Sequence, residues 1–102
     1  MRIIAGTYRG TALATVGKGD AGAHLRPTSD RVRESLFNVL AHQVDFAGMR
    51  VLDLFAGTGA LGLEALSRGA ESVPLVDDGR VSQGLSRKNI PLCRAADQCR
   101  LI

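Results

Sequence analysis

Two carboxylates and three glycines have types and spacings that suit the binding of a nucleoside cofactor. Residues 51–62 read VLDLFAGTGALG, in which Gly57, Gly59 and Gly62 match the pattern G-x-G-x-x-G. Such glycines let a backbone loop approach a ligand closely, and a helix that follows the loop offers free N–H groups. The same pattern also occurs in tight turns between a strand and a helix that bind nothing. The neighbouring side chains must therefore decide the ligand.

Asp53 lies inside the apolar run before this loop, where an unpaired charge is costly. In a dinucleotide site the first glycine comes directly at the strand end, so that the pyrophosphate rests on the helix dipole. Here Asp53 precedes Gly57 by four residues. A carboxylate that is held by the N–H groups of the loop can neutralise an ammonium group. We therefore interpret Asp53 as favouring a cofactor with a cationic amino-acid tail, such as S-adenosylmethionine (AdoMet), over NAD.

A second carboxylate follows the next predicted strand, in the segment VPLVDDGR. Asp77 in this segment can accept hydrogen bonds from both ribose hydroxyls of a nucleoside, in AdoMet as in NAD. Asp78 is the competing candidate for this role, and the other member of the pair would be solvated. Asp77 therefore supports a nucleoside ligand but does not choose between cofactors.

The elements that position these groups alternate between helical and strand patterns. Residues 1–16 predict a β-hairpin or two short strands, helices are predicted at 28–42, 60–68 and 81–90, and strands at 50–55, 72–76 and 100–102. Alternating strands and helices predict an α/β fold with a parallel sheet. The expected architecture is an N-terminal β-hairpin and helix, followed by the first half of a Rossmann-like sheet.

Four details of these elements are specific enough to test. Helix 28–42 should carry an apolar stripe at helical spacing, formed by Val32, Leu36, Phe37, Val39 and Leu40. Strand 50–55 is apolar at nearly every position, as expected of a strand that is buried on both faces. Pro74 should place strand 72–76 near an edge of the sheet or mark the start of the strand. The last helix should stop before Pro91.

Composition limits the class of protein and its partners. The chain has 102 residues, enough for one small domain, and no apolar run approaches the ~18 residues of a membrane span. Cys93 and Cys99 do not form a zinc pattern and are expected to be reduced thiols in a cytoplasmic protein. The net charge is +3, and the first 33 residues hold most of the excess. Eleven of the thirteen basic residues are Arg, which suits contact with phosphate, although a solvated basic face is equally compatible.

The segment VLDLFAGTGALGLEALSRGA (51–70) closely resembles the glycine loop of class I AdoMet-dependent methyltransferases. With MRIIAGTYRG at the start and LRPTSDRVRESLFNVL (25–40), the chain resembles the bacterial 16S ribosomal RNA guanine-N(2) methyltransferases. The resemblance divides the chain into a basic β-hairpin and loop extension at 1–24 and an incomplete class I methyltransferase domain at 25–102. It implies the methylation of a guanine amine in small-subunit RNA.

The resemblance also implies roles for matched positions. Asp53, Gly57 and Gly59 would frame the methionine end of AdoMet, Asp77 would hold the ribose, and Thr28 would help to close the pocket. The basic residues Arg2, Arg9 and Arg26 would contact RNA phosphates. The implied partner is 16S rRNA or a small-subunit assembly particle. The protein is expected to be a cytoplasmic monomer that uses neither a metal nor a membrane.

The chain departs from the family pattern in one large respect. Amino methyltransferases of this kind carry an Asn/Asp-Pro-Pro-aromatic motif after the fourth strand, which holds the target base. Here the only prolines are Pro27, Pro74 and Pro91, so no Pro-Pro pair is present. We therefore assign no catalytic residue and expect the chain to be the N-terminal part of a longer enzyme. On its own it should show little or no methyl transfer and bind AdoMet weakly.

Three alternative interpretations remain open from the sequence. An NAD(P)-binding module is favoured only by the spacing of the glycines. A non-enzymatic RNA-binding fragment would use the basic N-terminal segment and would need no cofactor. A remnant without function would fold with poor cooperativity.

Overall fold

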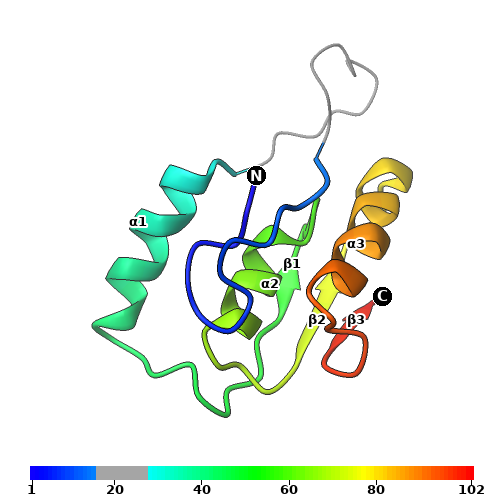
Figure 1. The fold of residues 1–102 in the computed structure, drawn as a ribbon. Helices are drawn as coiled ribbons and strands as arrows, with labels where there is room; N and C mark the ends of the chain where they lie inside the picture. Colours follow the sequence, from blue (N-terminus) through cyan, green and yellow to red (C-terminus); the bar gives the residue numbers. More distant parts are fainter. Residues whose placement is uncertain (16–27) are drawn as a thin grey trace.

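Three helices and a parallel sheet of three strands make up the computed structural model, which describes residues 1–15 and 28–102 (Figure 1). The elements in chain order are α1 (Asp30–Ala41), β1 (Asp53–Leu54), α2 (Ala60–Ser67), β2 (Val73–Val76), α3 (Arg80–Leu92) and β3 (Cys99–Leu101). The predicted order of helices and strands is confirmed. The predicted boundary between residues 24 and 25 lies outside the described residues.

The sheet has the strand order β1-β2-β3, so β2 is central. The regular part of β1 is only two residues long, and Asp53 pairs with Leu75 of β2. Pairing continues irregularly on both sides of it: Val51 N–H donates to the Ser72 carbonyl at 2.9 Å, and Ala56 N–H donates to the Val76 carbonyl at 2.8 Å. The predicted strand 50–55 therefore runs beside β2 over its length, but only a short part of it forms a regular ladder of hydrogen bonds.

Of the two predicted positions for Pro74, the sheet edge is wrong because β2 is the central strand, whereas the strand start holds to within one residue, since Pro74 is the second residue of β2. Pro74 pairs with Arg100 of β3. Successive N–H groups along a strand point to opposite sides. Val73 N–H points towards β3, where it donates to the Gln98 carbonyl at 2.8 Å. The position of the missing Pro74 N–H therefore faces β1, where the pairing is already irregular, and the sheet loses little.

The prediction that the last helix stops before Pro91 is also wrong, because α3 continues through Leu92. A proline in a helix removes one N–H and crowds the carbonyl four residues earlier. Pro91 sits in the final turn, and the Cys93 N–H behind it still reaches the carbonyls of Asn89 and Ile90. The buried residues Asn89 and Ile90 hold this last turn against the core.

The N-terminal residues form the predicted hairpin, reduced to one antiparallel bridge between Arg2 and Ala12. Ile3 N–H donates to the Thr11 carbonyl at 3.0 Å, and Leu13 N–H donates to the Met1 carbonyl at 2.9 Å. Gly6 turns the chain at φ +88°, where a Cβ atom would lie 2.0 Å from the Ser67 carbonyl oxygen. The hairpin thus lies directly on α2, and Figure 1 shows it crossing that helix.

Helix α1 begins at the predicted place, since the Ser29 side chain caps it by accepting from Val32 N–H at 3.2 Å. The predicted apolar stripe lies on the helix but is only partly buried, through Phe37 and the half-buried Leu40. Only Arg33 and Phe37 of α1 are buried, whereas Val32, Leu36 and Val39 are exposed. The helix is held by a buried arginine and one aromatic ring rather than by its aliphatic face.

A buried charge network joins the hairpin to both α1 and α2. The fully buried Glu64 carboxylate accepts from Ile4 N–H at 2.9 Å, from Ala5 N–H at 3.1 Å and from Arg68 Nε at 2.9 Å. Arg33, also fully buried, donates to the carbonyl of Arg2 and to Asp30. Its Nε lies 3.9 Å from Glu64 Oε1, too far for a hydrogen bond, so this contact is only Coulombic.

The core is aliphatic, as the low aromatic content predicts. Ile3 and Leu13 of the hairpin belong to the same cluster as Leu63 of α2 and Leu75 of β2. Cys93 and Cys99 are both buried and free, which confirms the predicted thiols. Burial raises the pKa of Cys93 to about 11 and that of Cys99 to about 12. Within residues 1–15 and 28–102, no helix combines the length and the apolar character needed to cross a membrane.

Two helical glycines provide a matched test of this packing. A Cβ atom on Gly62 would lie 2.5 Å from Leu75 Cδ2 and 2.8 Å from Val73 Cγ1, whereas a Cβ atom on Gly84 would meet nothing within 4 Å. We expect Gly62→Ala to lower the free energy of unfolding by about 1–3 kcal/mol through overpacking. Gly84→Ala should raise it by about 0.4–1 kcal/mol. Urea titrations of both variants, followed by circular dichroism, would measure this, and equal effects would contradict the packing described.

The second prediction concerns the Glu64 carboxylate. Glu64→Gln removes the buried negative charge and leaves Arg33 and Arg68 without it, so the free energy of unfolding should fall by about 3–5 kcal/mol. The exposed Glu71 provides the control, because Glu71→Gln should change the free energy of unfolding by less than about 0.5 kcal/mol. A Glu64→Gln variant that unfolds at the same urea concentration as the unsubstituted chain would show that the network does not hold the fold together.

Candidate functional site

The glycine loop between β1 and α2 has a backbone that only glycine adopts easily. Gly57 has φ +57°, and Gly59, at the N-cap of α2, has φ +83°. Gly62 lies in the first turn of α2, where its missing side chain allows the helix to pack closely on β2. The three glycines therefore have the distinct roles of loop turn, helix start and close packing that the motif predicts.

Asp53 is buried beside this loop with 8% of its surface exposed. Its Oδ2 atom accepts from the Gly62 N–H in the first turn of α2 at 2.9 Å. Burial raises the pKa of Asp53, the Gly62 hydrogen bond partly opposes this, and the nearby charge of Asp77 adds to the rise. The carboxylate is thus held by a helix N-terminus, and no salt bridge to a cation is present among the described residues.

Asp77 follows β2 and holds the same loop from the next strand. Its Oδ2 atom accepts from Gly57 N–H at 2.9 Å, and its Oδ1 atom accepts from Gly79 N–H at 2.8 Å. The neighbouring Asp78 is exposed. The structure therefore brings Asp53, Asp77 and the glycines together, and it distinguishes the half-buried Asp77 from Asp78. A carboxylate has about four lone-pair sites, so Asp77 can still accept from a ligand hydroxyl.

These hydrogen bonds leave the loop poorly suited to a pyrophosphate. An anion at a helix N-terminus needs free N–H groups. Here the N–H groups of Gly57 and Gly62 are taken by carboxylates, and that of Ala60 is taken by Thr58 Oγ1 at 3.3 Å. Two carboxylates at one loop would also repel a further anion. The charge distribution agrees with the interpretation of Asp53 as a group that meets a cation.

Two residues of α3 donate hydrogen bonds to the glycine loop, and neither was predicted from the sequence. Ser86 Oγ donates to the Gly57 carbonyl at 2.9 Å, and Asn89 Nδ2 donates to the Thr58 carbonyl at 2.8 Å. Asn89 also bonds both backbone groups of Ala14, at 2.6 and 3.0 Å. It therefore ties the N-terminal segment to the glycine loop. The only signal for Asn89 in the sequence was a residue of low helix propensity beside the apolar Ile90.

Thr28 and Arg26 were predicted beside the cofactor and the RNA. The Thr28 carbonyl accepts from Arg33 Nη1 at 3.0 Å, so this residue is bonded to α1. Arg26 lies outside the described residues. Phe55, which the sequence suggested as core, is 90% exposed and has φ +57°. It follows directly after β1 and precedes the glycine loop.

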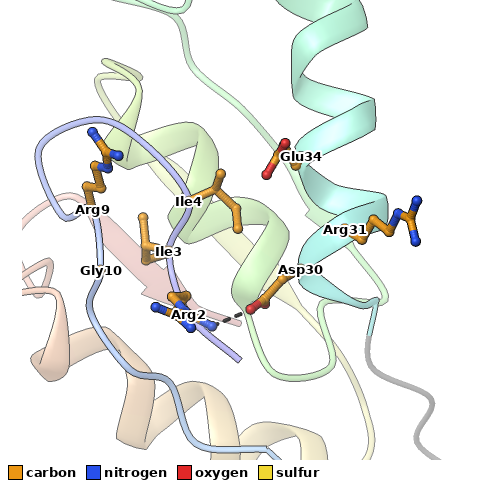
Figure 2. Close-up of a pocket in the computed structure, with 8 residues that line it drawn as sticks. All are labelled: Arg2, Ile3, Ile4, Arg9, Gly10, Asp30, Arg31 and Glu34. Atoms are coloured by element: carbon orange, nitrogen blue, oxygen red, sulfur yellow. Dashed lines mark hydrogen bonds between the residues drawn. The ribbon is translucent and has the colours of Figure 1, made fainter.

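A cavity of about 450 Å³ lies between the hairpin and α1 (Figure 2). Arg2 and Arg9 line it together with Asp30, Arg31 and Glu34. Asp30 accepts from the Arg2 N–H at 3.1 Å. Although burial alone would raise the pKa of Asp30, this bond and the Arg33 guanidinium hold it below the usual value. Arg31 points away from Arg2 in Figure 2. The structure thus brings Arg2 and Arg9 to one surface, beside two carboxylates.

Among residues 1–15 and 28–102, no three His, Cys, Asp or Glu side chains are grouped so that they could hold a metal ion.

Comparison with known proteins shows the family and the fold of this chain. The family model described as conserved hypothetical protein 95 matches residues 1–102. Ribosomal RNA small subunit methyltransferase D of Escherichia coli is 48% identical over 95% of this chain and 46% of its own length. The solved structure of yhhF from Escherichia coli is 39% identical, with a TM-score of 0.78 over 100% of this chain and 51% of that one.

A more distant structure supports the fold alone. A methyltransferase from Thiobacillus denitrificans, solved with S-adenosyl-L-homocysteine, is 18% identical, with a TM-score of 0.64 over 87% of this chain and 37% of its own. The chain spans less than half the length of the curated relatives it matches, for example 39% of the rRNA methyltransferase relative YlbH from Bacillus subtilis. The predicted fold, the first half of a Rossmann-like class I methyltransferase sheet, is confirmed, and the chain belongs to the family described as conserved hypothetical protein 95.

Proposed function

We propose that this chain forms the cofactor-binding half of an AdoMet-dependent methyltransferase that modifies the exocyclic amine of a guanine in 16S ribosomal RNA. The observation that carries the proposal is the anionic glycine loop, in which Asp53 and Asp77 hold the N–H groups of Gly62 and Gly57. A loop of this kind favours a ligand with a cationic end and ribose hydroxyls. The relatives named as small-subunit rRNA methyltransferases support the RNA substrate.

The residues present fit AdoMet at two points. The Asp53 carboxylate has no cationic partner among the described residues, so the ammonium of a methionine tail would supply one. Asp77 would accept from the ribose hydroxyls with its remaining lone pairs, while Gly57 and Gly59 let the backbone lie close to the ligand. When bound, AdoMet supplies a methyl group that is already activated by its sulfonium. The contribution of this chain is therefore to bind and orient rather than to move protons.

The hairpin and α1 provide the second part of the proposal. Arg2 and Arg9 line the cavity of Figure 2 and are both exposed, so they can reach RNA phosphates. Arg26 remains part of the proposed RNA surface, and Thr28 part of the proposed cofactor pocket. Asn89 ties the end of the hairpin to the glycine loop, and this bond keeps the proposed RNA surface in a fixed place relative to the cofactor.

A substitution at Asp53 tests the cofactor assignment. Asp53→Asn keeps an oxygen for the Gly62 N–H but removes the charge, so affinity for S-adenosylhomocysteine and AdoMet should fall at least about tenfold, or ~1.4 kcal/mol. NAD binding, if calorimetry detects any, should not change. Asp78→Asn, at the exposed neighbour, is the matched control and should leave all affinities as they are. Tighter binding of NAD than of S-adenosylhomocysteine would overturn the assignment.

The raised pKa of Asp53 gives the same experiment a pH dependence. A folded-state pKa above the unfolded value means that folding favours the protonated form, so the charged form costs stability at neutral pH. Asp53→Asn should therefore be at least as stable as the parent chain at pH 7, and this advantage should shrink as the pH falls through the pKa of Asp53. Cofactor affinity of the parent chain should fall over the same range. A variant that unfolds more easily at pH 7 would contradict this sign.

A substitution at Arg9 tests the RNA surface. Arg9→Gln removes one proposed phosphate contact, so the slope of log affinity against log salt for a 16S rRNA fragment should become shallower by about 0.7–1. Arg80→Gln, at an exposed arginine of α3, is the control and should leave the slope unchanged. Equal slopes for the two variants would show that Arg9 does not belong to the RNA-binding surface. RNA binding that persists after Asp53→Asn, with no cofactor binding in the parent chain, would favour the RNA-binding alternative.

A further inference from the structure

The turn of the N-terminal hairpin and the end of α3 enclose a second cavity, of about 340 Å³. Thr7, Tyr8, Arg9 and Thr11 of the hairpin line it together with Arg94, which follows α3, and we call it the Arg9–Arg94 cavity. No residue of the glycine loop is among those that line it. The cavity is therefore distinct from the proposed cofactor site.

The charges that line this cavity are all positive. Arg9 and Arg94 are exposed and bring two guanidinium groups to it, and within the part of the chain that the structure describes no Asp or Glu lines it. Cys93 also lines it, and burial raises the pKa of this thiol to about 11, so that it is uncharged at neutral pH. The cavity of Figure 2, by contrast, has the carboxylates of Asp30 and Glu34 beside its arginines. An anion therefore fits the Arg9–Arg94 cavity better.

The hairpin side of the cavity is held in place by α2. Thr7 N–H donates to the Ser67 carbonyl at 2.8 Å, and Tyr8 N–H donates to Ser67 Oγ at 2.8 Å. Thr7, Tyr8 and Thr11 add hydroxyl groups to the two guanidinium groups. Arginine and hydroxyl side chains are among the groups that commonly contact the phosphates of nucleic acids. The donors that a phosphate needs are thus present on a wall that is already fixed.

Arg94 has a backbone conformation that helix ends usually give to glycine. Its φ is +52°, and it directly follows Cys93, the C-cap of α3. Arg94 N–H donates to the Pro91 carbonyl at 3.0 Å, and Ala95 N–H donates to the Ile90 carbonyl at 3.0 Å. This pair of bonds is the Schellman motif, in which glycine is preferred at the left-handed position because it has no Cβ atom. An arginine there costs stability, and such strain is found where a side chain serves a function.

The competing explanation is that Arg94 only complements the dipole of α3. A cation stabilises a helix C-terminus, which carries about half a negative charge. Residues 80–96 already include three further basic residues and no Asp or Glu. A dipole role requires Arg94 to stabilise the fold, so its replacement by glycine should destabilise the chain. A ligand-binding role predicts the opposite sign, because glycine relieves the left-handed backbone.

We propose that the Arg9–Arg94 cavity binds the phosphate backbone of an RNA strand, with Arg9 and Arg94 on neighbouring phosphates and the hydroxyls of Thr7 and Thr11 as further donors. The inference rests on the proposed function and adds a second side to its RNA surface. Arg9 lines both this cavity and that of Figure 2, so the bound strand would continue around the hairpin turn towards α3. Phosphate contacts position a strand but do not read its bases, so this site would orient the RNA without selecting the guanine.

Salt-dependent RNA binding by the 102-residue chain tests the cavity. Arg94→Gln removes one phosphate contact, so the slope of log affinity against log salt for a 16S rRNA fragment should become shallower by about 0.7–1, and affinity at low salt should fall at least about threefold. Arg100→Gln is the matched control, because Arg100 is exposed on β3 and does not line the cavity. It should leave the slope unchanged. Fluorescence anisotropy titrations at several salt concentrations would measure both variants.

Arg94→Gly separates a ligand-binding role from a structural one. This variant should bind RNA as weakly as Arg94→Gln, yet unfold at a higher urea concentration than the parent chain, because glycine adopts the left-handed backbone without strain. Urea titrations followed by circular dichroism would measure the midpoint and confirm that the variant folds. A lower midpoint would assign Arg94 to the dipole of α3 and overturn the inference.

The remaining outcomes separate this inference from the proposed function. A shallower slope for Arg9→Gln but not for Arg94→Gln would overturn the cavity and leave the RNA surface of Figure 2 in place. An effect of Arg94→Gln in a chain that binds no S-adenosylhomocysteine would uphold the cavity and reject the cofactor. Equal slopes for Arg94→Gln and Arg100→Gln, or no RNA binding by the parent chain at low salt, would overturn the cavity. Binding of inorganic phosphate without RNA binding, lost in Arg94→Gln, would assign it to a small phosphate ligand instead.

Discussion

Two carboxylates from neighbouring strands hold the glycine loop, and the rest of the site depends on this arrangement. Asp53 takes the Gly62 N–H at the start of α2, and Asp77 takes the Gly57 N–H from the end of β2. The helix N-terminus, which in a dinucleotide site would receive a pyrophosphate, is therefore already occupied by side chains of the protein. The loop carries negative charge into a buried position, and a cationic ligand end is the natural complement.

The N-terminal hairpin is part of the same structure because buried polar groups tie it down. Glu64 accepts two backbone N–H groups of the hairpin, and Asn89 bonds Ala14 as well as the glycine loop. A buried carboxylate of this kind is costly unless all its lone pairs are used, so its partners are strongly constrained. The backbone of the hairpin is thus bonded both to α2 and to the α3 residue that holds the glycine loop.

The aliphatic faces of α1 and β1 contrast with this well-satisfied interior. Leu52 and Leu54 belong to a strand whose sequence predicts burial on both faces, yet both side chains are exposed in this sheet. A small domain has little burial to spare, and exposed apolar residues of this kind are those that a further layer of structure would cover.

Local patterns in the sequence determined the elements and predicted the ligand class. The cap at Ser29, the glycines of the loop and the alternation of strands and helices placed α1, α2 and β2 within a few residues, since each rests on the preferences of a few adjacent residues. The unusual position of Asp53 in an apolar strand pointed to the charge of the loop.

Only the tertiary structure decided which faces are buried and which polar groups meet. Pro74 proved compatible with the central strand because its missing N–H faces irregular pairing, and Pro91 with the last turn of α3. Asn89, Glu64 and Arg33 could not be assigned from spacing, because their partners in the N-terminal segment are between 31 and 75 residues away along the chain. Whether Val32, Leu36 and Leu52 are buried likewise depends on which segment packs over them. A pattern of apolar residues predicts a buried face but does not identify the segment that covers it.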